Sequence, residues 1–310
     1  LIASSAAFAS SKHGSVVPST QKAVLVTGAS TGIGRKITEV LATKGYFVYA
    51  GARKQKDLDA LNKLENVQSI RLDVTIQKEI DAAVETVRNG GRGLHGIVNN
   101  AGVASFGPLI EVKEEDVKWL FDINVFGVLR MNQAFAPLII ENKGRIVTTG
   151  SIAGINSGPF LGSYNMSKHA IEAYTDALAV EMMPFGVNVS VIEPGAFKSE
   201  IINSAFKKIG GMNEQMEKSP YADVYRARLN SLPATDSFKE PDAVADAAVH
   251  ALFDDHPKRR YMVMPSRENA HDAMKKLVNK LAQLNDGLEY NFSREELIAM
   301  LDYALGDDEK

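Results

Sequence analysis

Short apolar runs rich in β-branched residues recur along the chain, and the segments between them carry apolar residues three or four positions apart. Runs of this length and composition predict strands, whereas the wider spacing predicts helices. The predicted strands cover residues 23–27, 46–51, 67–72, 94–98, 145–150, 188–193 and 261–264. Helices are predicted directly after the first strand and over residues 78–88, 115–140 and 242–253. The alternation predicts an α/β fold, a parallel sheet with helices on both faces.

Three segments depart from this alternation. Residues 1–21 are rich in Ser and Ala without any period and are left out of the fold; they are interpreted as a disordered leader, with a remnant of a signal or transit segment as the alternative. Residues 197–235 show no sustained period and predict a long, mobile, functional loop. Residues 266–310 predict a helical C-terminal extension, whose second helix starts with a capping-box pattern at Ser293. We interpret these helices as packing elements, with an oligomer or membrane-surface contact as the alternative.

Composition limits the possible functions. The chain has 310 residues, of which 45% are hydrophobic and 24% charged, which suits one large domain over residues 22–265 with additions. A net charge of −3 without a long basic run argues against binding to nucleic acid. The absence of cysteine rules out disulfides and thiolate metal sites, and no metal site is predicted. No uninterrupted apolar stretch reaches about 18 residues, so we expect no transmembrane segment and a cytoplasmic location.

A glycine-rich turn follows the first predicted strand and precedes a helix. The turn contains Gly28, Gly32 and Gly34, with Ile33 beginning the apolar stripe of the helix. Glycines at this place let the backbone approach a pyrophosphate, whose charge lies on the helix N-terminus. The spacing G-x-x-x-G-x-G differs from the usual G-x-G-x-x-G, so the turn favours a nucleotide site only in combination with other features.

The second predicted strand is followed by Ala52, Arg53 and Lys54. An NAD site places a carboxylate here for the ribose 2′-hydroxyl, whereas an arginine suits the 2′-phosphate of NADP. The sequence therefore favours NADP over NAD. The alternative is that the two basic residues begin a solvated helix.

Tyr164 and Lys168 are four residues apart, so they share one face of a predicted helix. An ammonium group near a phenol favours the phenolate and makes it a usable acid or base at neutral pH. Ser151 ends the fifth predicted strand and would hold a substrate oxygen at the same sheet edge. The alternative for this spacing alone is a surface Tyr and Lys on an ordinary amphipathic helix. Asn124 lies inside a predicted helix, where we expect it to turn inward to a partner.

Taken together, these motifs resemble those of one family. They are Thr27-Gly28-x-x-x-Gly32-Ile33-Gly34, Asp73-Val74, Asn99-Asn100-Ala101-Gly102, Asn124, Ser151, Tyr164-x-x-x-Lys168 and Pro194-Gly195. Their order resembles the short-chain dehydrogenase/reductase family, and the resemblance covers residues 22–265. It implies a Rossmann-type doubly wound fold with a seven-stranded parallel sheet, and a homo-oligomer, either a dimer or a tetramer. The long loop and the C-terminal extension are loosely similar to the retinol and hydroxysteroid dehydrogenase branch.

The resemblance also implies residue roles. Tyr164 would be the general acid/base, Lys168 would lower its pKa and bind the nicotinamide ribose, Ser151 would position the substrate, and Asn124 would hold a water linking Lys168 to solvent. The implied cofactor residues are Gly28, Ser30, Gly32, Ile33 and Gly34 near the pyrophosphate, Arg53 at the 2′-phosphate, Asp73 and Val74 at the adenine, Asn100 at the adenosine ribose, Pro194 and Gly195 after the sixth strand, and Ser199 at the carboxamide.

The predicted function is an oxidoreductase, of the carbonyl-reductase kind, that moves a hydride between NADP(H) and a ketone, aldehyde or secondary alcohol. A pocket wall of Phe106, Phe160, Leu161 and Phe197 favours a hydrophobic substrate. Two alternatives are a dinucleotide-binding sensor or scaffold without turnover, and an epimerase or dehydratase on the same fold.

Overall fold

A seven-stranded parallel sheet forms the centre of the computed structural model, which describes residues 21–201, 216–230, 237–287 and 289–306. Its strands are β1 Ala23–Val26, β2 Phe47–Ala52, β3 Val67–Arg71, β4 Gly96–Asn99, β5 Arg145–Thr149, β6 Asn188–Pro194 and β7 Arg260–Val263. Their order is β3-β2-β1-β4-β5-β6-β7, so the chain reverses its direction of winding between β1 and β4. Ligand sites of open α/β sheets lie at such a switch point, beyond the carboxyl ends of the strands. The predicted doubly wound fold is confirmed.

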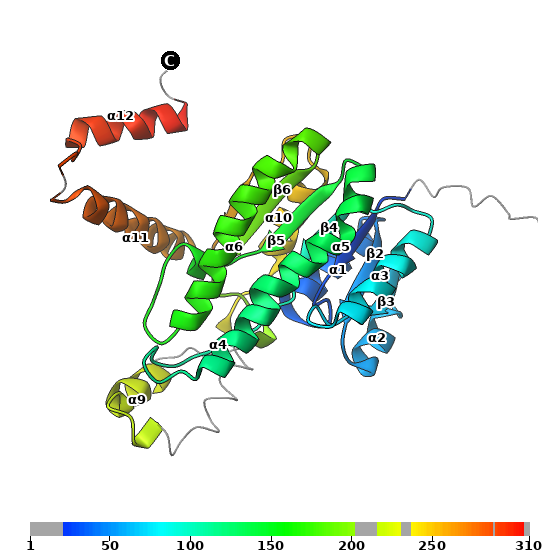
Figure 1. The fold of residues 1–310 in the computed structure, drawn as a ribbon, viewed down its shortest axis with the longest axis horizontal. Helices are drawn as coiled ribbons and strands as arrows, with labels where there is room; N and C mark the ends of the chain where they lie inside the picture. The colour runs from blue at the N-terminus through cyan, green and yellow to red at the C-terminus, as the bar shows by residue number, and fades with distance from the viewer. Residues whose placement is uncertain (1–20, 202–215, 231–236, 288, 307–310) are drawn as a thin grey trace, which may run out of the picture.

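Helices cover both faces of the sheet (Figure 1). One face carries α1 Gly32–Thr43, α2 Gln55–Leu61 and α10 Asp242–Phe253, and the other carries α3 Gln77–Asn89, α5 Gly127–Glu141 and α6 Gly162–Glu181. Sequence periodicity did not predict the short helix α2, whose only buried residues are Leu58 and Leu61.

Alternate strand residues supply two separate cores. Leu25 and Ile97 pack into the core beneath α3 and α5, whereas Val26 and Val98 pack into the core beneath α1 and α10. All four side chains are fully buried. Successive side chains of a strand point to opposite faces, so a strand covered on both sides must be apolar throughout. This is why the strands read as continuous apolar runs.

The long helix predicted over residues 115–140 is interrupted. It consists of α4 Glu114–Phe121, a π-helical turn Asp122–Phe126, and α5. Single π-turns within helices are rare and frequently occur at functional sites. Here the turn carries Asn124 inward, where only 2% of its surface is exposed.

The helical run Glu114–Glu141 is long and apolar enough to cross a membrane when judged by length and composition alone, although polar residues interrupt its apolar sequence. Half of its most apolar stretch is buried inside the protein, and the inner residues Met131, Phe135 and Ile139 are fully buried in the core beneath α3 and α5. This burial is that of a core helix.

The segment predicted as loop over residues 197–235 contains a helix, α9 Ala222–Asn230. The sequence did not predict this helix, because it has too few apolar residues to form an apolar stripe along one face. Tyr225 alone among its described side chains is buried. The remainder of the loop prediction falls partly on residues 202–215 and 231–236, outside the described residues, as does the leader at residues 1–20.

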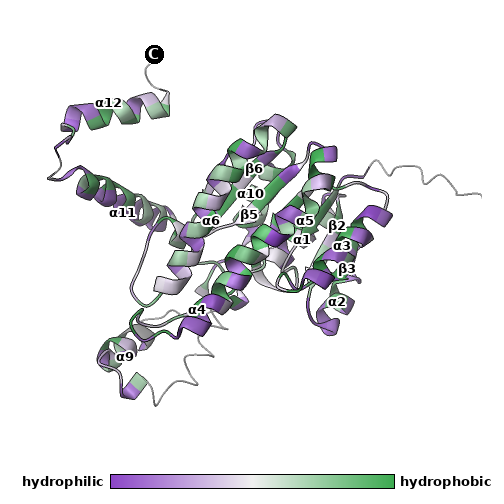
Figure 2. Cartoon of the chain, viewed as in Figure 1, coloured by the Kyte–Doolittle hydropathy of each residue, from purple (hydrophilic) through white to green (hydrophobic). Residues whose placement is uncertain are grey.

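The C-terminal helices point away from the sheet (Figure 1). It comprises α11 Arg267–Asn285 and α12 Arg294–Leu305, and the capping box predicted at Ser293 is present. Helix α11 contacts the rest of the protein where Asn156 Nδ2 donates to the Ala273 carbonyl oxygen at 3.1 Å. No residue of α12 is buried, and apolar and polar residues are interspersed along both helices (Figure 2). The predicted packing is therefore limited to α11.

Candidate active site

The glycine turn joins β1 to the N-terminus of α1. Gly28 has a φ of +65°, a conformation that favours glycine. A Cβ atom on Gly34 would collide with the Gly28 carbonyl oxygen and the Asn100 side-chain amide. The turn is therefore compact, and its backbone N–H groups at the start of a helix suit an anion.

Thr27 and Asn100 hold this turn in place. Thr27 Oγ1 accepts hydrogen bonds from the backbone N–H groups of Asn100 and Ala101, both at 3.0 Å. The side-chain amide of Asn100 donates to the carbonyl oxygens of Thr27 at 3.1 Å and Gly28 at 3.2 Å. Asn100 is predicted at the adenosine ribose. In the structure its side-chain amide binds the backbone of the glycine turn instead, and so links the ends of β1 and β4.

Arg53 and Asp73 meet at the carboxyl ends of β2 and β3. Arg53 Nη1 lies 3.6 Å from Asp73 Oδ2, and 61% of the Arg53 side chain is exposed. Burial would raise the pKa of Asp73, but hydrogen bonds from Thr75 and the charge of Arg53 outweigh it and lower that pKa. Arg53 immediately precedes Lys54, which is the N-cap of α2. The two basic residues therefore do stand at the start of a helix, as the alternative interpretation expected. An exposed guanidinium beside one carboxylate leaves most of its donors available to a phosphate.

The remaining predicted cofactor residues lie along the same edge of the sheet. Ser30 and Ile33 belong to the glycine turn and the first turn of α1, Val74 follows β3, and Pro194 ends β6. Gly195 donates from its N–H group to the Val263 carbonyl oxygen at 2.8 Å. The Ser199 Cα lies 3.2 Å from where a Cβ on Gly32 would be, so Ser199 faces the glycine turn. A glycine cradle with an exposed arginine on one side of it fits a dinucleotide carrying a 2′-phosphate.

Ser151, Tyr164 and Lys168 come together beyond β5. The Lys168 Nζ atom lies 5.8 Å from the centre of the Tyr164 ring and donates to the Thr149 carbonyl oxygen at 2.8 Å. The Ser151 hydroxyl accepts from the Ala153 N–H at 3.1 Å and forms a hydrogen bond with Tyr164. Lys168 is 6% and Ser151 9% exposed. The burial of Lys168 argues against the alternative of a surface Tyr and Lys, while Tyr164 itself is half-buried.

The electrostatics of this group differ from the prediction in one respect. Burial raises the pKa of Tyr164, and the hydrogen bond with Ser151 lowers it only in part. The expected lowering by Lys168 is absent, because the pKa of Lys168 lies below that of Tyr164 and the lysine has lost its charge before the phenol titrates. Burial lowers the pKa of Lys168 to about 8, against the opposing charge of Glu172. At neutral pH the protein therefore holds a neutral tyrosine beside a charged lysine.

Asn124 connects two segments of the site. Its side-chain oxygen accepts from the Val103 N–H and its amide donates to the Val103 carbonyl oxygen, both at 2.9 Å. The amide also donates to Ser167 Oγ at 3.1 Å, and Ser167 Oγ donates to the Tyr164 carbonyl oxygen at 2.8 Å. The π-turn is thereby tied to the loop after β4 and to the helix of Tyr164. The inward orientation predicted for Asn124 is confirmed.

Asn165 was not singled out in the sequence. Its amide donates to the carbonyl oxygens of Ala153 at 3.0 Å and Asn156 at 2.9 Å, which fixes the Ser151 segment on α6. The available signal was a cluster of small polar residues, Ser163, Asn165 and Ser167, around Tyr164. Their positions are buried, and a buried polar side chain needs a hydrogen-bond partner.

An aromatic cluster forms part of the predicted pocket wall. Phe106 and Phe160 stack with ring centres 5.5 Å apart, and Phe160 lies 5.1 Å from Tyr225 of α9 and 5.9 Å from Tyr221. Phe197, also predicted for this wall, is instead 4% exposed in the core beneath α1 and α10. The chain turns back toward that core after Gly195. Leu161 is half-buried at the N-cap of α6.

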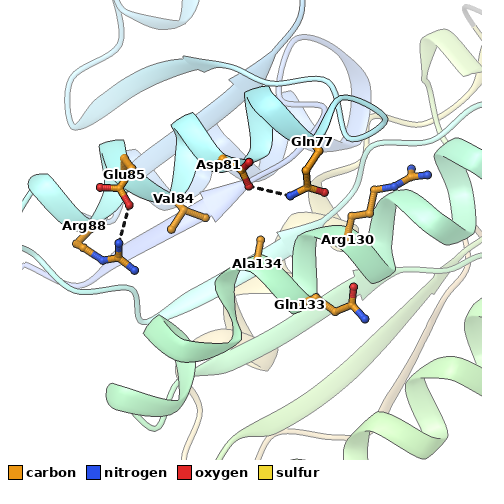
Figure 3. Close-up of a pocket in the computed structure, with 8 residues that line it drawn as sticks. All are labelled: Gln77, Asp81, Val84, Glu85, Arg88, Arg130, Gln133 and Ala134. Atoms are coloured by element: carbon orange, nitrogen blue, oxygen red, sulfur yellow. Dashed lines mark hydrogen bonds and ion pairs between the residues drawn. The ribbon is translucent and has the colours of Figure 1, made fainter.

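A cavity of about 470 Å³ lies elsewhere, between α3 and α5 (Figure 3). Polar and charged side chains such as Gln77, Asp81 and Arg130 line it, and none of the predicted site residues does. Within the described ranges, no three His, Asp or Glu side chains gather where they could hold a metal ion.

Known proteins are similar to this chain in sequence and in fold. A family model described as short chain dehydrogenase matches residues 22–210. The NADPH-dependent 3-dehydrocapnine reductase of Ornithobacterium rhinotracheale is 35% identical over 253 residues, covering 78% of this chain and 88% of the relative. Mitochondrial D-beta-hydroxybutyrate dehydrogenase of Rattus norvegicus is 34% identical over 265 residues, covering 78% and 77%. The structure of a short chain dehydrogenase/reductase from Burkholderia phymatum in complex with NAD is similar with a TM-score of 0.71 and 25% identity, covering 88% of this chain and 98% of that one. A glycine turn at the switch point, a Ser–Tyr–Lys group beyond β5 and a family match over more than half its length lead to one conclusion: the chain belongs to the short-chain dehydrogenase family.

Proposed function

We propose that the protein is an NADP(H)-dependent oxidoreductase that transfers a hydride to or from the carbonyl or alcohol carbon of a hydrophobic ketone, aldehyde or secondary alcohol. The observation that carries the proposal is the group of Ser151, Tyr164 and Lys168, the first and last buried and the tyrosine half-buried, at the sheet edge that also bears the glycine turn. The hydride would come from the nicotinamide ring when NADP(H) is bound.

Tyr164 exchanges a proton with the substrate oxygen. Its raised pKa keeps the phenol protonated at neutral pH, which is the form that donates a proton during carbonyl reduction. Ser151, already hydrogen-bonded to Tyr164, orients the substrate oxygen between the two hydroxyls. The ammonium of Lys168 stabilises the phenolate that remains after proton transfer. Asn124 positions the helix of Tyr164 through Ser167.

Arg53 provides the preference for NADP. Its guanidinium is mostly exposed at the end of β2, the place where a 2′-phosphate would lie beside the glycine turn. The relatives support both cofactors, since the Ornithobacterium enzyme is named NADPH-dependent and the Burkholderia structure contains NAD. The charge at residue 53 and the absence of a carboxylate at Ala52 favour NADP in this chain.

The aromatic cluster supports a hydrophobic substrate. Phe106, Phe160 and Tyr225 belong to three segments that follow β4, β5 and β6, and all three segments leave the sheet at its carboxyl edge. Phe160 has a φ of +63°, an unusual conformation for a bulky residue that is often found at ligand sites. An apolar wall offers few hydrogen bonds or charges to a charged substrate, whereas it packs well against an alkyl or ring substituent.

We also propose a homo-oligomer formed through α4, α5 and α6, which lie together on one face of the sheet (Figure 1). Trp119, Phe126 and Met166 on these helices and the π-turn are between 39% and 49% exposed, which suits a covered surface. The cytoplasmic location remains a prediction, because residues 1–20 lie outside the described part of the chain and one relative is mitochondrial.

Turnover of a carbonyl panel with NADPH, followed by nicotinamide absorbance, tests the proposal. We expect a hydrophobic ketone to be reduced faster than the keto acid with the same carbon chain, and Tyr164→Phe to slow both reactions by about 10²- to 10⁴-fold. NADPH binding without turnover of any ketone, aldehyde or alcohol would instead support a sensor or scaffold. Faster reduction of the keto acid would contradict the substrate class alone.

A further inference from the structure

A cluster of ionisable side chains, two of them buried carboxylates, forms where α6 meets β6 and β7. Arg260, from the edge strand β7, contacts three carboxylates: Glu172, which it binds at short range, Glu193 at 2.7 Å and Asp176 at 2.6 Å. Glu172 and Asp176 belong to α6, whereas Glu193 lies on β6 immediately before Pro194. Glu193 is 2% and Glu172 8% exposed. Sustaining several buried charges is costly unless they are paired, so such a cluster needs a reason.

Glu172 also faces the segment that carries Ser151. A Cβ atom on Gly150 would lie 2.8 Å from Glu172 Oε1, and one on Gly154 would lie 3.0 Å from the same atom. The glycines on both sides of Ser151 thus leave the space that the carboxylate occupies. Glu172 follows Lys168 by four residues, which places the two side chains on one face of α6. The carboxylate therefore lies beside the turn that carries Ser151 and on the same face of α6 as Lys168, whose pKa its charge raises.

We propose that Glu172, held by Arg260 against Glu193, is a positioning residue that keeps Lys168 charged above neutral pH. This inference rests on the role proposed for Lys168. The ionisable groups that face Glu172 are Lys168 and Asp176 from α6, Glu193 from β6 and Arg260 from β7; the turn from Gly150 to Gly154 has none. On the neighbouring α11, Lys280 donates to the Ile155 carbonyl oxygen.

The direction of the effect follows from the charges. Burial and the charge of Glu193 raise the pKa of Glu172 to about 7, against the opposing effect of Arg260. Glu172 thus becomes negative just below the pH at which Lys168, with a pKa of about 8, would lose its proton. A negative charge beside the ammonium raises the pKa of Lys168. Removing the carboxylate must therefore make Lys168 lose its proton at a lower pH.

The test is a titration of Lys168 followed by the ¹³Cε signal of labelled lysine, assigned from its loss in Lys168→Arg. In Glu172→Gln we expect the midpoint to fall by about one pH unit. In Glu172→Asp, which keeps a carboxylate, it should fall less. Asp176→Asn is the matched control, because it removes a half-exposed carboxylate from Arg260 and should leave the midpoint where it is. An unchanged midpoint in folded Glu172→Gln, or an equal fall in Asp176→Asn, would overturn the proposal.

Activity supplies the second measurement. In Glu172→Gln, the alkaline limb of the pH profile of kcat/KM should move to lower pH by the same amount as the midpoint. The titration needs no substrate, so a moved midpoint in a protein without turnover would disprove the proposed function and leave this inference standing. Should Glu172→Gln fail to fold, Arg260→Lys keeps one charge but cannot reach three carboxylates. A wild-type Lys168 midpoint in that variant would also overturn the proposal.

Discussion

The two ends of the site are built differently. At the substrate end, Ser151 and Lys168 are buried and bonded to neighbouring backbone groups, and buried ionisable side chains lie behind them. At the phosphate end, Arg53 is 61% exposed and has one carboxylate 3.6 Å away. Proton transfer needs groups fixed in a poorly solvated place, where their charges interact strongly. Choosing between two cofactors needs only a charge at the right position. Substitutions at the first end should therefore cost far more than substitutions at the second.

The largest effect is expected for Lys168→Ala. It removes the ammonium that stabilises the phenolate and a donor for the nicotinamide ribose, so both kcat and NADPH affinity should fall. General acid–base catalysis contributes about 10²- to 10⁴-fold, and this variant should lose at least that much. Steady-state kinetics and a fluorescence titration with NADPH measure the two losses. Lys276→Ala, on the exposed surface of α11, is the control. Wild-type NADPH affinity in Lys168→Ala would show that the lysine acts on the chemistry alone.

Tyr164→Phe should have the next largest effect. The substitution removes the proton donor and almost nothing else, so turnover should fall by about 10²- to 10⁴-fold while NADPH binding stays nearly intact. Kinetics in both directions and the same fluorescence titration check this separation. If the variant kept more than about a tenth of the wild-type rate, another group would have to be the acid.

At the phosphate end, Arg53→Ala should reduce the preference for NADP about ten- to a hundredfold, because a bond to a charged group contributes about 1.5 to 3 kcal/mol. NADP binding should weaken while NAD binding is spared. Ala52→Asp should shift the preference toward NAD, because its charge repels the 2′-phosphate of NADP. Dissociation constants for both cofactors with each variant measure the change. A full NADP preference in Arg53→Ala would mean that the phosphate is read elsewhere, with Lys54 or Arg35 as the next candidates.

What the sequence predicted well depends on local pattern. The strands were found because buried parallel strands are apolar along their whole length, and Ser151 could be placed at the same edge as Gly28 because parallel strands end together. The fold and the grouping of the site residues followed from these two facts and the family resemblance.

What it missed depends on tertiary contact. The π-turn at Asn124 changes the hydrogen-bond register of a helix without changing its apolar stripe. Glu172 and Arg260 are 88 residues apart, and nothing in either local sequence indicates that they meet. The pKa of Tyr164 was predicted in the wrong direction, because burial outweighs the neighbouring groups and cannot be read from spacing. Phe197 was assigned to the pocket for its chemistry, although the chain turns it into the core.

The smallest effect is expected at the aromatic cluster, which closes the substrate end from outside. Tyr225 is 3% exposed, its ring lies 5.1 Å from Phe160, and Glu111 accepts a hydrogen bond from Ser219 at 2.7 Å just before α9. Tyr225→Ala should loosen α9 from this wall. Aromatic pairs contribute about 0.5 to 1.5 kcal/mol, so KM for a hydrophobic ketone should rise about two- to tenfold.

NADPH affinity should not change, because the cluster lies away from the glycine turn. Tyr303→Ala, on an exposed side chain of α12, should change neither quantity. A fall in kcat without a change in KM would mean that α9 supports Tyr164 instead, and the two ends of the site would then be less separate than their burial indicates.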